Sequence, residues 1–306
     1  MLSILIVNYN GMRFLRDCLD SVRAHVHCPH EVIIVDNASA DDSVAYIRAN
    51  FPEVRLIASE VNTGFTGGNN LAAEAASGDL LLLLNNDTVI LSDIQAAVDR
   101  FSAPQVGITG AHLCYADRRN QPSVGYEHTP LRMVLSWLGV SGLAALPTAF
   151  RLMERAPAFY QADRGDVAWV SGAFLLTRRE LWNQLGGLDE RYFMYVEDVD
   201  YCRRVRQAGY RIDYVAGVDV LHYEGAGKAW IGEMALMRTV TSYALYLNKY
   251  YGGVAATLAK RCLGAVMVAR AQAYRLRKLL GSPSPEVTAQ KHLAYAKAGY
   301  FLLTAR

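Results

Sequence analysis

Hydrophobic and polar positions alternate in blocks along the first 115 residues. Residues 2–8 are almost wholly apolar, as expected of a strand buried on both faces of a parallel sheet. Apolar residues then return at helical spacing at Leu15, Cys18, Leu19 and Val22, with charged residues between them. Blocks of both kinds repeat up to residue 113, joined by short turns rich in Gly, Asn and Asp. The alternation predicts an α/β fold with a doubly wound, mostly parallel sheet and helices on both faces.

The same pattern predicts the bounds of the elements. Strands are expected at 2–8, 31–35, 54–58, 79–84, 106–113 and 167–176, and two short ones at 211–215 and 218–223. Helices are expected at 43–50, 69–76, 93–101, 179–185 and 197–208, the last closed by Gly209. The pattern loosens in an apolar insert at about 116–166, and the chain is helix-rich after residue 225. We expect one domain at 1–228 and a helical region at 229–306.

Polar side chains follow the ends of three predicted strands. They are Asn8 and Asn10 after the first strand, Asp36 and Asn37 after the second, and Asn85, Asn86 and Asp87 after the five leucines at 80–84. Ligands of open α/β sheets bind beyond the carboxyl ends of the strands. The polar residues are therefore predicted to form the floor of one binding site.

Charge divides the chain into two parts. Residues 1–233 contain 20 Lys and Arg against 28 Asp and Glu, whereas residues 234–306 contain 11 against the single acid Glu286. A basic helical segment interleaved with apolar residues suits an anionic membrane surface. An ordinary solvated face is the alternative. Nucleic acid is not expected as a partner, because no helix-turn-helix, zinc spacing or RNA-binding aromatic motif accompanies the charge.

Cysteine usage and hydropathy indicate the compartment. The five cysteines are scattered without a C-x-x-C, which disfavours a disulfide framework or zinc site and favours reducing cytoplasm. Met1 leads directly into an apolar strand, so no signal peptide is expected. Residues 133–150 lack charge, but glycines and a proline interrupt them, which favours a surface-active loop or helix pair over a membrane span. We expect a cytoplasmic protein bound peripherally to the inner face of the cell membrane.

Six motifs carry a family resemblance. They are "SILIVNYNG", "EVIIVDNASADDS", "NTGFTGGNN", "LLLLNNDTV", the stretch from "SGAFLLTRRELW" to "GGLDERYFMYVEDVDYCRRVRQAGYRI", and "VLHYEGAG". In this order and spacing the sequence resembles inverting glycosyltransferase family 2, which has the GT-A fold, and within it the bacterial rhamnosyltransferase-like members. The resemblance spans residues 2 to about 228 and leaves the basic helical extension uncovered.

The resemblance implies a nucleotide-sugar donor site. Its residues would be Asn8, Asn10, Asp36, Asn62, Gly64, Asn69, Asn85, Asn86 and Asp87. Asp36 is similar in position to the acid that accepts the N3–H of a pyrimidine base, and the glycine-rich stretch at 62–70 would line the pocket beside a helix N-terminus, which favours anions. An Asx-turn or helix cap at Asp36 and an ordinary turn at the glycines are the alternatives.

The resemblance also implies a divalent cation, Mg²⁺ or Mn²⁺, held by Asp87 and His222. Asn85 stands where the first Asp of a D-x-D element is often found, and one carboxylate suffices in principle because substrate phosphates complete the coordination. A cap at the end of a strand for Asp87 and a hydrogen-bonded core role for His222 are the alternatives.

By the same resemblance Asp198 is the general base, and Trp169, Gly172 and Glu197 lie on the acceptor side with an aromatic cluster at 192–195. Acids in a first helical turn are also ordinary, which is the interpretation preferred for Asp200. Core packing is the alternative for the aromatic side chains. A second carboxylate for a two-step retaining reaction is not evident, so inversion is expected.

These residues together predict a glycosyltransferase. It would move a sugar from dTDP-rhamnose or a UDP-sugar to a saccharide acceptor, lipid-linked in view of the basic region, in cell-surface polysaccharide synthesis. Two alternatives remain open. One is a non-catalytic sugar-nucleotide-binding or scaffold relative; the other, less favoured, is a nucleotidyltransferase.

Overall fold

The computed structural model describes residues 1–140, 147–223 and 232–305. Two compact units are present, and each is described by itself. Unit 1 takes the described residues of Met1–Glu127, Met153–Phe193 and Glu197–Glu224. Unit 2 takes those of His128–Leu152, Met194–Val196 and Gly225–Arg306.

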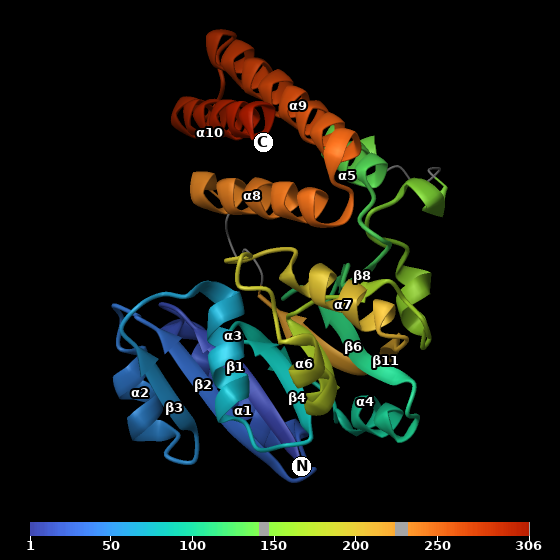
Figure 1. Cartoon of the computed structure of the whole chain (residues 1–306). Helices are drawn as coiled ribbons and strands as arrows, with labels where there is room; N and C mark the ends of the chain where they lie inside the picture. Colours follow the sequence, from blue (N-terminus) through green and yellow to red (C-terminus); the bar gives the residue numbers. More distant parts are fainter. Residues whose placement is uncertain (141–146, 224–231, 306) are drawn as a thin grey trace. The chain divides into compact units, whose positions relative to one another are not determined.

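Unit 1 alternates strands and helices (Figure 1). Its strands are β1 (Leu2–Asn8), β2 (His30–Asn37), β3 (Arg55–Ser59), β4 (Leu80–Asn85), β5 (Thr88–Ile90), β6 (Val106–Cys114), β7 (Asn120–Gln121), β8 (Val124–Gly125), β9 (Trp169–Val170), β10 (Phe174–Arg178) and β11 (Arg211–His222). Its helices are α1 (Met12–His25), α2 (Ser43–Asn50), α3 (Gly64–Ala75), α4 (Gln95–Asp99), α6 (Arg179–Leu185) and α7 (Glu197–Gln207), with short 3₁₀ turns at Arg100–Ser102 and Pro157–Gln161.

Within the described residues, nine strands form the main sheet. The order is β3-β2-β1-β4-β10-β6-β11-β5, with β7 paired to β6. Strands β1 to β4 pair in parallel, as do β6 and β11, while β10 and β5 run antiparallel to their neighbours. Strands β8 and β9 pair separately. The expected GT-A type of α/β sheet is confirmed.

The leucine run of β4 is buried on both faces of this sheet. Leu82 and Leu84 belong to the core that packs against α1, α2 and α4. Leu81 and Leu83 are equally buried and, since side chains alternate along a strand, face the opposite layer. On that layer Thr177 of β10 contacts Tyr201 of α7. A central strand covered on both faces has no position for a polar residue until it ends.

Several predicted bounds were wrong. The single strand expected at 167–176 is two strands, because Phe174 N–H donates to Ser171 O in a turn between them. The two short strands expected near the end of the unit are one, β11, with an irregularity between Val215 and Asp219 that the sequence pattern registered as a break. Helix α3 begins at Gly64, five residues earlier than expected, and β5 was not anticipated.

Unit 2 is helical. Its helices are α5 (Pro130–Leu138), α8 (Gly232–Tyr250), α9 (Gly253–Leu279) and α10 (Pro285–Thr304), with a 3₁₀ turn at Thr148–Phe150. Gly264 and Gly299 let α9 and α10 cross closely, since a Cβ on either would lie 3.1 Å from the other's carbonyl oxygen. No helix in the described ranges combines the length and apolarity needed to cross a bilayer. Part of the apolar stretch expected at 133–150 lies outside the described residues.

Candidate active site

The ends of β1, β2 and β4 are joined by side-chain hydrogen bonds. Asn8 Nδ2 donates to Asp36 Oδ2 at 2.7 Å, and Asn86 Nδ2 donates to Asn8 Oδ1 at 2.7 Å. The three strand ends predicted to meet do meet. Asp36 also accepts from the backbone N–H and the hydroxyl of Ser39, at 2.9 and 2.7 Å, so it makes the Asx-turn contacts that were its alternative role. Asn10 accepts at Oδ1 from Ala40 N–H at 2.7 Å and helps to hold the same turn.

The glycine-rich stretch is the first part of α3 instead of a loop before it. Asn62 Oδ1 accepts from Gly64 N–H at 2.9 Å, and Gly64 has a φ of 77° that suits glycine. The helix packs directly on the sheet, since a Cβ on Gly68 would lie 2.8 Å from both methyl groups of Val7. Asn69 is buried and donates to Phe65 O, yet its Oδ1 has no hydrogen-bond partner among the described residues. That orphaned oxygen is an acceptor available to a ligand on this helix.

Asp87 and His222 lie side by side. Nε2 of His222 is 3.3 Å from Oδ1 of Asp87, because β5 pairs with β11 and brings Thr88 opposite His222. Asn85 Nδ2 is 3.2 Å from the same Nε2. The other ring nitrogen, Nδ1, is 3.2 Å from Oε1 of Gln121, an amide oxygen that can only accept. In the tautomer in which Nδ1–H donates to Gln121, the lone pair of Nε2 faces Asn85 and Asp87.

This donor set fits a divalent cation. A carboxylate and an imidazole nitrogen are adjacent, and beside them Asn85 Oδ1 is buried with no hydrogen-bond partner in the described part of the chain. A metal-bound His usually donates its other N–H to an oxygen, the role Gln121 fills here. In the described part of the chain, no group of three or more His, Cys, Asp or Glu side chains is placed to hold a metal. Such a pair suits an ion completed by substrate oxygens.

Asp198 lies at the start of α7 and is held by two backbone N–H groups. Gly172 donates to Oδ2 at 3.0 Å, and Val199 donates to Oδ1 at 2.8 Å. Asn85 N–H donates to the carbonyl of Ala173, the next residue after Gly172. A two-residue piece of backbone thus connects Asp198 to the strand end that carries Asn85. Burial raises the pKa of Asp198, and the two hydrogen bonds oppose the rise.

Glu197 is buried beside Asp198, and no described residue forms a hydrogen bond with its Oε2. Burial, and next the charge of Asp198, raise the pKa of Glu197 well above its usual value. A carboxyl in this position holds its proton more readily than its neighbour does. Burial therefore favours the protonated form of Glu197 more strongly than that of Asp198, whose oxygens accept two backbone N–H bonds.

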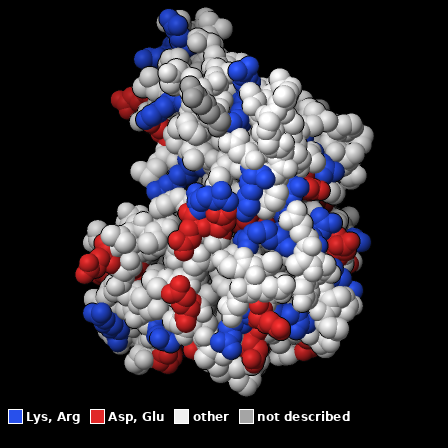
Figure 2. All heavy atoms as spheres, viewed as in Figure 1, with Lys and Arg blue, Asp and Glu red and all other residues white. Residues whose placement is uncertain are grey.

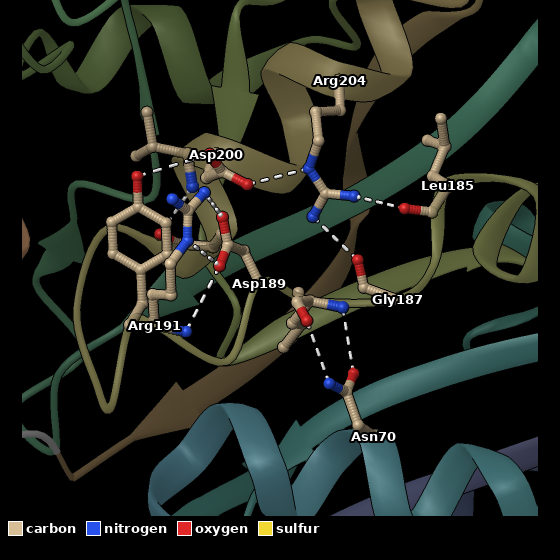
Figure 3. Close-up of polar contacts among 11 residues, drawn as sticks. Asn70, Leu185, Gly187, Asp189, Arg191, Asp200 and Arg204 are labelled. Atoms are coloured by element: carbon tan, nitrogen blue, oxygen red, sulfur yellow. Dashed lines mark hydrogen bonds and ion pairs between the residues drawn. The ribbon is translucent and has the colours of Figure 1, made fainter. Parts of the chain in front are cut away.

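Two predicted acceptor-side aromatic residues are packing elements. Trp169 is buried, and its indole N–H donates to Tyr126 O at 3.0 Å. Tyr192 is wholly buried, with its hydroxyl 3.4 Å from Asp200 Oδ1. Asp200 pairs with Arg204 at 2.8 Å (Figure 3), so the Arg204 side chain points inward.

Comparison with known proteins decides the family. Residues 2–238 match the family described as "Glycosyltransferase like family 2". The chain belongs to this family. This glycosyltransferase is 30% identical over 242 residues to the N-acetylglucosaminyl-diphospho-decaprenol L-rhamnosyltransferase of Mycobacterium tuberculosis, an alignment covering 73% of this chain and 76% of the relative. It is 25% identical over 231 residues to the rhamnosyltransferase WbbL of Escherichia coli, covering 73% and 83% of the two chains.

Solved structures share the fold of the glycosyltransferase. The mannosyltransferase PcManGT of Pyrobaculum calidifontis, in complex with GDP-Man and Mn²⁺, superposes with a TM-score of 0.57 at 17% identity, covering 99% of this chain and 87% of that one. At this identity the likeness concerns the fold alone, and it confirms the predicted fold class. The family match and the rhamnosyltransferase relatives confirm the predicted family and glycosyltransferase activity.

Sequence reasoning missed two residues of the site. Gln121 lies in the insert where periodicity is lost, and no sequence signal marked it. Ser39 closes the turn around Asp36. Asn37, which was expected at the floor of the site, is buried and donates to Gly64 O at 2.7 Å, which ties β2 to the start of α3.

Proposed function

We propose that the protein transfers a sugar, with inversion, from a nucleoside-diphosphate sugar to a saccharide acceptor on a polyprenyl diphosphate. dTDP-rhamnose is the first candidate donor and UDP-sugars are the second. The observation that carries the proposal is Asp198, a carboxylate fixed by two backbone N–H groups and joined through Gly172 and Ala173 to the strand end of Asn85. The rhamnosyltransferase relatives support the choice of donor and of a lipid-linked acceptor for cell-surface polysaccharide.

In the proposed reaction Asp198 removes the proton of the acceptor hydroxyl while that oxygen attacks the anomeric carbon. The new carbon–oxygen bond forms as the bond to the diphosphate breaks on the opposite face, so the configuration inverts and the nucleoside diphosphate leaves with the electron pair. Gly172 and Val199 hold both oxygens of Asp198 in place. Trp169, Gly172 and Glu197 remain our assignment for the acceptor side, with Trp169 acting through packing and Gly172 through its backbone N–H.

The donor would lie along Asn8, Asn10, Asp36, Asn62, Gly64, Asn69, Asn85, Asn86 and Asp87. The orphaned Oδ1 atoms of Asn69 and Asn85 support this assignment, since buried acceptors without partners are rare. Asp87 and His222 would hold Mg²⁺ or Mn²⁺, which neutralises charge on the leaving diphosphate when bound. Asp87 would keep its carboxylate and His222 its Nε2 lone pair directed to that position.

The basic helical unit is proposed to face an anionic membrane, which would place a lipid-linked acceptor near the enzyme. On the face shown in Figure 2, basic side chains recur over the helical unit with few acidic ones among them. The last turns of α9 expose Leu276 and Leu279 among three basic residues, and Leu280, also exposed, follows the helix. Apolar and cationic groups together suit the headgroup region of an anionic leaflet. The protein would then act peripherally on the inner face of the cell membrane.

The test is sugar transfer from dTDP-rhamnose and from UDP-sugars to N-acetylglucosaminyl-diphospho-polyprenol, measured as product and as released nucleoside diphosphate. Asp198→Asn keeps the shape of the side chain and is expected to lower transfer by about 10²–10⁴-fold. Asp20→Asn, at an exposed site on α1, is the control and keeps full activity. Unchanged transfer in Asp198→Asn contradicts the mechanism. Binding of donor without any transfer by the wild type would instead support the non-catalytic alternative.

A further inference from the structure

The chain segment 185–193, called here the clamp segment, is held by α3 from one direction. Oδ1 of Asn70 accepts from Leu188 N–H at 2.9 Å, and Nδ2 donates to Leu188 O at 2.9 Å (Figure 3). One side-chain amide therefore satisfies both backbone groups of Leu188, as a neighbouring strand would. Nδ2 also lies 3.0 Å from Glu190 Oε1. The clamp segment cannot shift along α3 without breaking these bonds.

Helix α7 holds the same segment through Arg204. Nη1 donates to Leu185 O at 2.9 Å and Nη2 donates to Gly187 O at 2.7 Å, while Nε donates to Asp200 Oδ2 at 2.8 Å (Figure 3). Leu185 is the last residue of α6, so the guanidinium caps the C-terminus of that helix. Asp200 is fully buried, and Arg204 is partly buried, with 16% of its side chain exposed. Charge-assisted bonds of this kind are shorter and stronger than neutral ones.

The backbone of the clamp segment lies close to Asn70 of α3 and to Trp182 of α6. Gly187 has a φ of 67°, and a Cβ there would lie 2.6 Å from Asn70 Oδ1 and 3.0 Å from Trp182 Nε1. Farther along, Phe193 O accepts from Phe65 N–H at 2.9 Å in the first turn of α3. The clamp segment is thus hydrogen-bonded to α3 at Leu188 and at Phe193. It is hydrogen-bonded to α7 through the guanidinium of Arg204.

The two helices carry opposite parts of the proposed site. Gly64 and Asn69 of α3 belong to the donor side, and Asp198 of α7 is the proposed base. The two parts are close, because a Cβ on Gly172 would lie 3.5 Å from both Asp198 Cβ and the ring of Phe65. Their separation depends on how the helices are tied together.

We propose that Asn70 and Arg204 are positioning residues that set the distance between the donor side of the site and the general base by gripping the clamp segment from α3 and from α7. The inference rests on the proposed function, in which Asp198 is the base. Among the described residues, the side-chain hydrogen bonds of Asn70 and Arg204 reach the clamp segment and Asp200, and none reaches Asp198. A misplacement of about 1 Å between a catalytic group and its substrate can cost on the order of 10²-fold in rate.

Two variants test the proposal. Arg204→Lys keeps the positive charge opposite Asp200 but loses the fork that reaches two carbonyls, and Asn70→Ala removes the amide pair. Each is expected to lower kcat for rhamnosyl transfer by about 10–100-fold with the donor KM within about twofold of the wild type. The acidic limb of the kcat–pH profile should also move to higher pH, because a displaced Asp198 loses hydrogen bonding that opposes its raised pKa.

Matched controls lie on the same elements. Arg206→Lys changes an arginine of α7 that lies 3.8 Å from Asp166, and Asn183→Ala changes an exposed asparagine of α6. Both should keep the wild-type kcat and pH profile. Thermal melting measures the folded fraction, so that kcat is expressed per folded molecule.

The outcomes separate this inference from the proposed function. If Asp198→Asn abolishes transfer while Arg204→Lys and Asn70→Ala keep the wild-type kcat and acidic limb per folded molecule, the positioning role is refuted and the base assignment stands. If Asp198→Asn is fully active, the proposed function fails first. A loss that is confined to folded yield, with no shift of the acidic limb, shows a purely structural role and also overturns the inference.

Discussion

Nε2 of His222 lies 3.3 Å from Oδ1 of Asp87, although the two residues come from distant parts of the chain. The pairing of β5 with β11 creates this contact, and Gln121 orients the ring from the other side. The arrangement places an imidazole lone pair and a carboxylate at one point, where substrate oxygens can complete the coordination of an ion.

Gln121 should therefore affect metal affinity without being a ligand. Gln121→Leu removes the acceptor that orients His222, and we expect Mn²⁺ binding in the presence of dTDP to weaken by about 10–100-fold. His222→Ala should weaken it at least as much. Isothermal titration of Mn²⁺ into protein saturated with dTDP provides the measurement.

A second histidine–acid pair supplies the control for this titration. His112 of β6 has its Nδ1 2.7 Å from Oδ1 of Asp219, which lies on β11 like His222 but on the opposite face of the sheet. His112→Ala should leave Mn²⁺ binding unchanged. Equal affinities in the Gln121→Leu and wild-type proteins would contradict the orienting role.

Glu197 should make stability depend on pH. Its folded-state pKa is raised, first by burial, so the folded state keeps a proton where the unfolded chain has lost it. The contribution is complete below the unfolded pKa and is lost as pH rises toward the folded one. Glu197→Gln mimics the protonated acid, so its melting temperature relative to the wild type should increase between about pH 5 and pH 8. A difference that is constant across this range would show that Glu197 does not titrate in this way.

Gly110 should be required for close packing of β6. A Cβ at this position would lie 2.6 Å from Cβ of Val170, whereas a Cβ on Gly217 of β11 meets nothing within 4 Å. Gly110→Ala is expected to lower the free energy of unfolding by about 1–3 kcal/mol, as overpacked cores do. Gly217→Ala is the matched control and should change it by less than about 0.5 kcal/mol. Urea denaturation compares the two variants, and equal stabilities would refute the packing argument.

Membrane binding should depend on the end of α9. Replacing Arg275, Arg277 and Lys278 by Ala is expected to weaken flotation with anionic liposomes by about 10²-fold, given roughly 1 kcal/mol for each basic residue. The same number of replacements at exposed Arg16, Arg48 and Arg119 of unit 1 is the control. Absence of flotation by the wild-type protein, or equal flotation on neutral liposomes, would contradict the proposal.

Most of the sheet could be predicted because its signals are local. A strand covered on both faces must be apolar along its whole length, so Leu2–Asn8 was predicted to the residue, and Ser43–Asn50 was found from its helical spacing. The predicted strand bounds were wrong where a turn or an irregularity in the backbone interrupts the regular alternation of side chains along a strand. The turn at Ser171 divides one apolar run into β9 and β10, and the irregularity in β11 joins two runs into one strand.

The sequence by itself determined the α/β class, the polar strand ends at Asn8, Asp36 and Asn85, and the family to which the chain belongs, because each of these depends on neighbouring residues or on motif order. Only the tertiary structure decided that Gln121 orients His222 and that Arg204 turns inward to hold the clamp segment. Those contacts join residues that are far apart in the sequence. Such residues meet only when the sheet order and the helix packing are set, and the local pattern of hydrophobic and polar residues does not specify either of these.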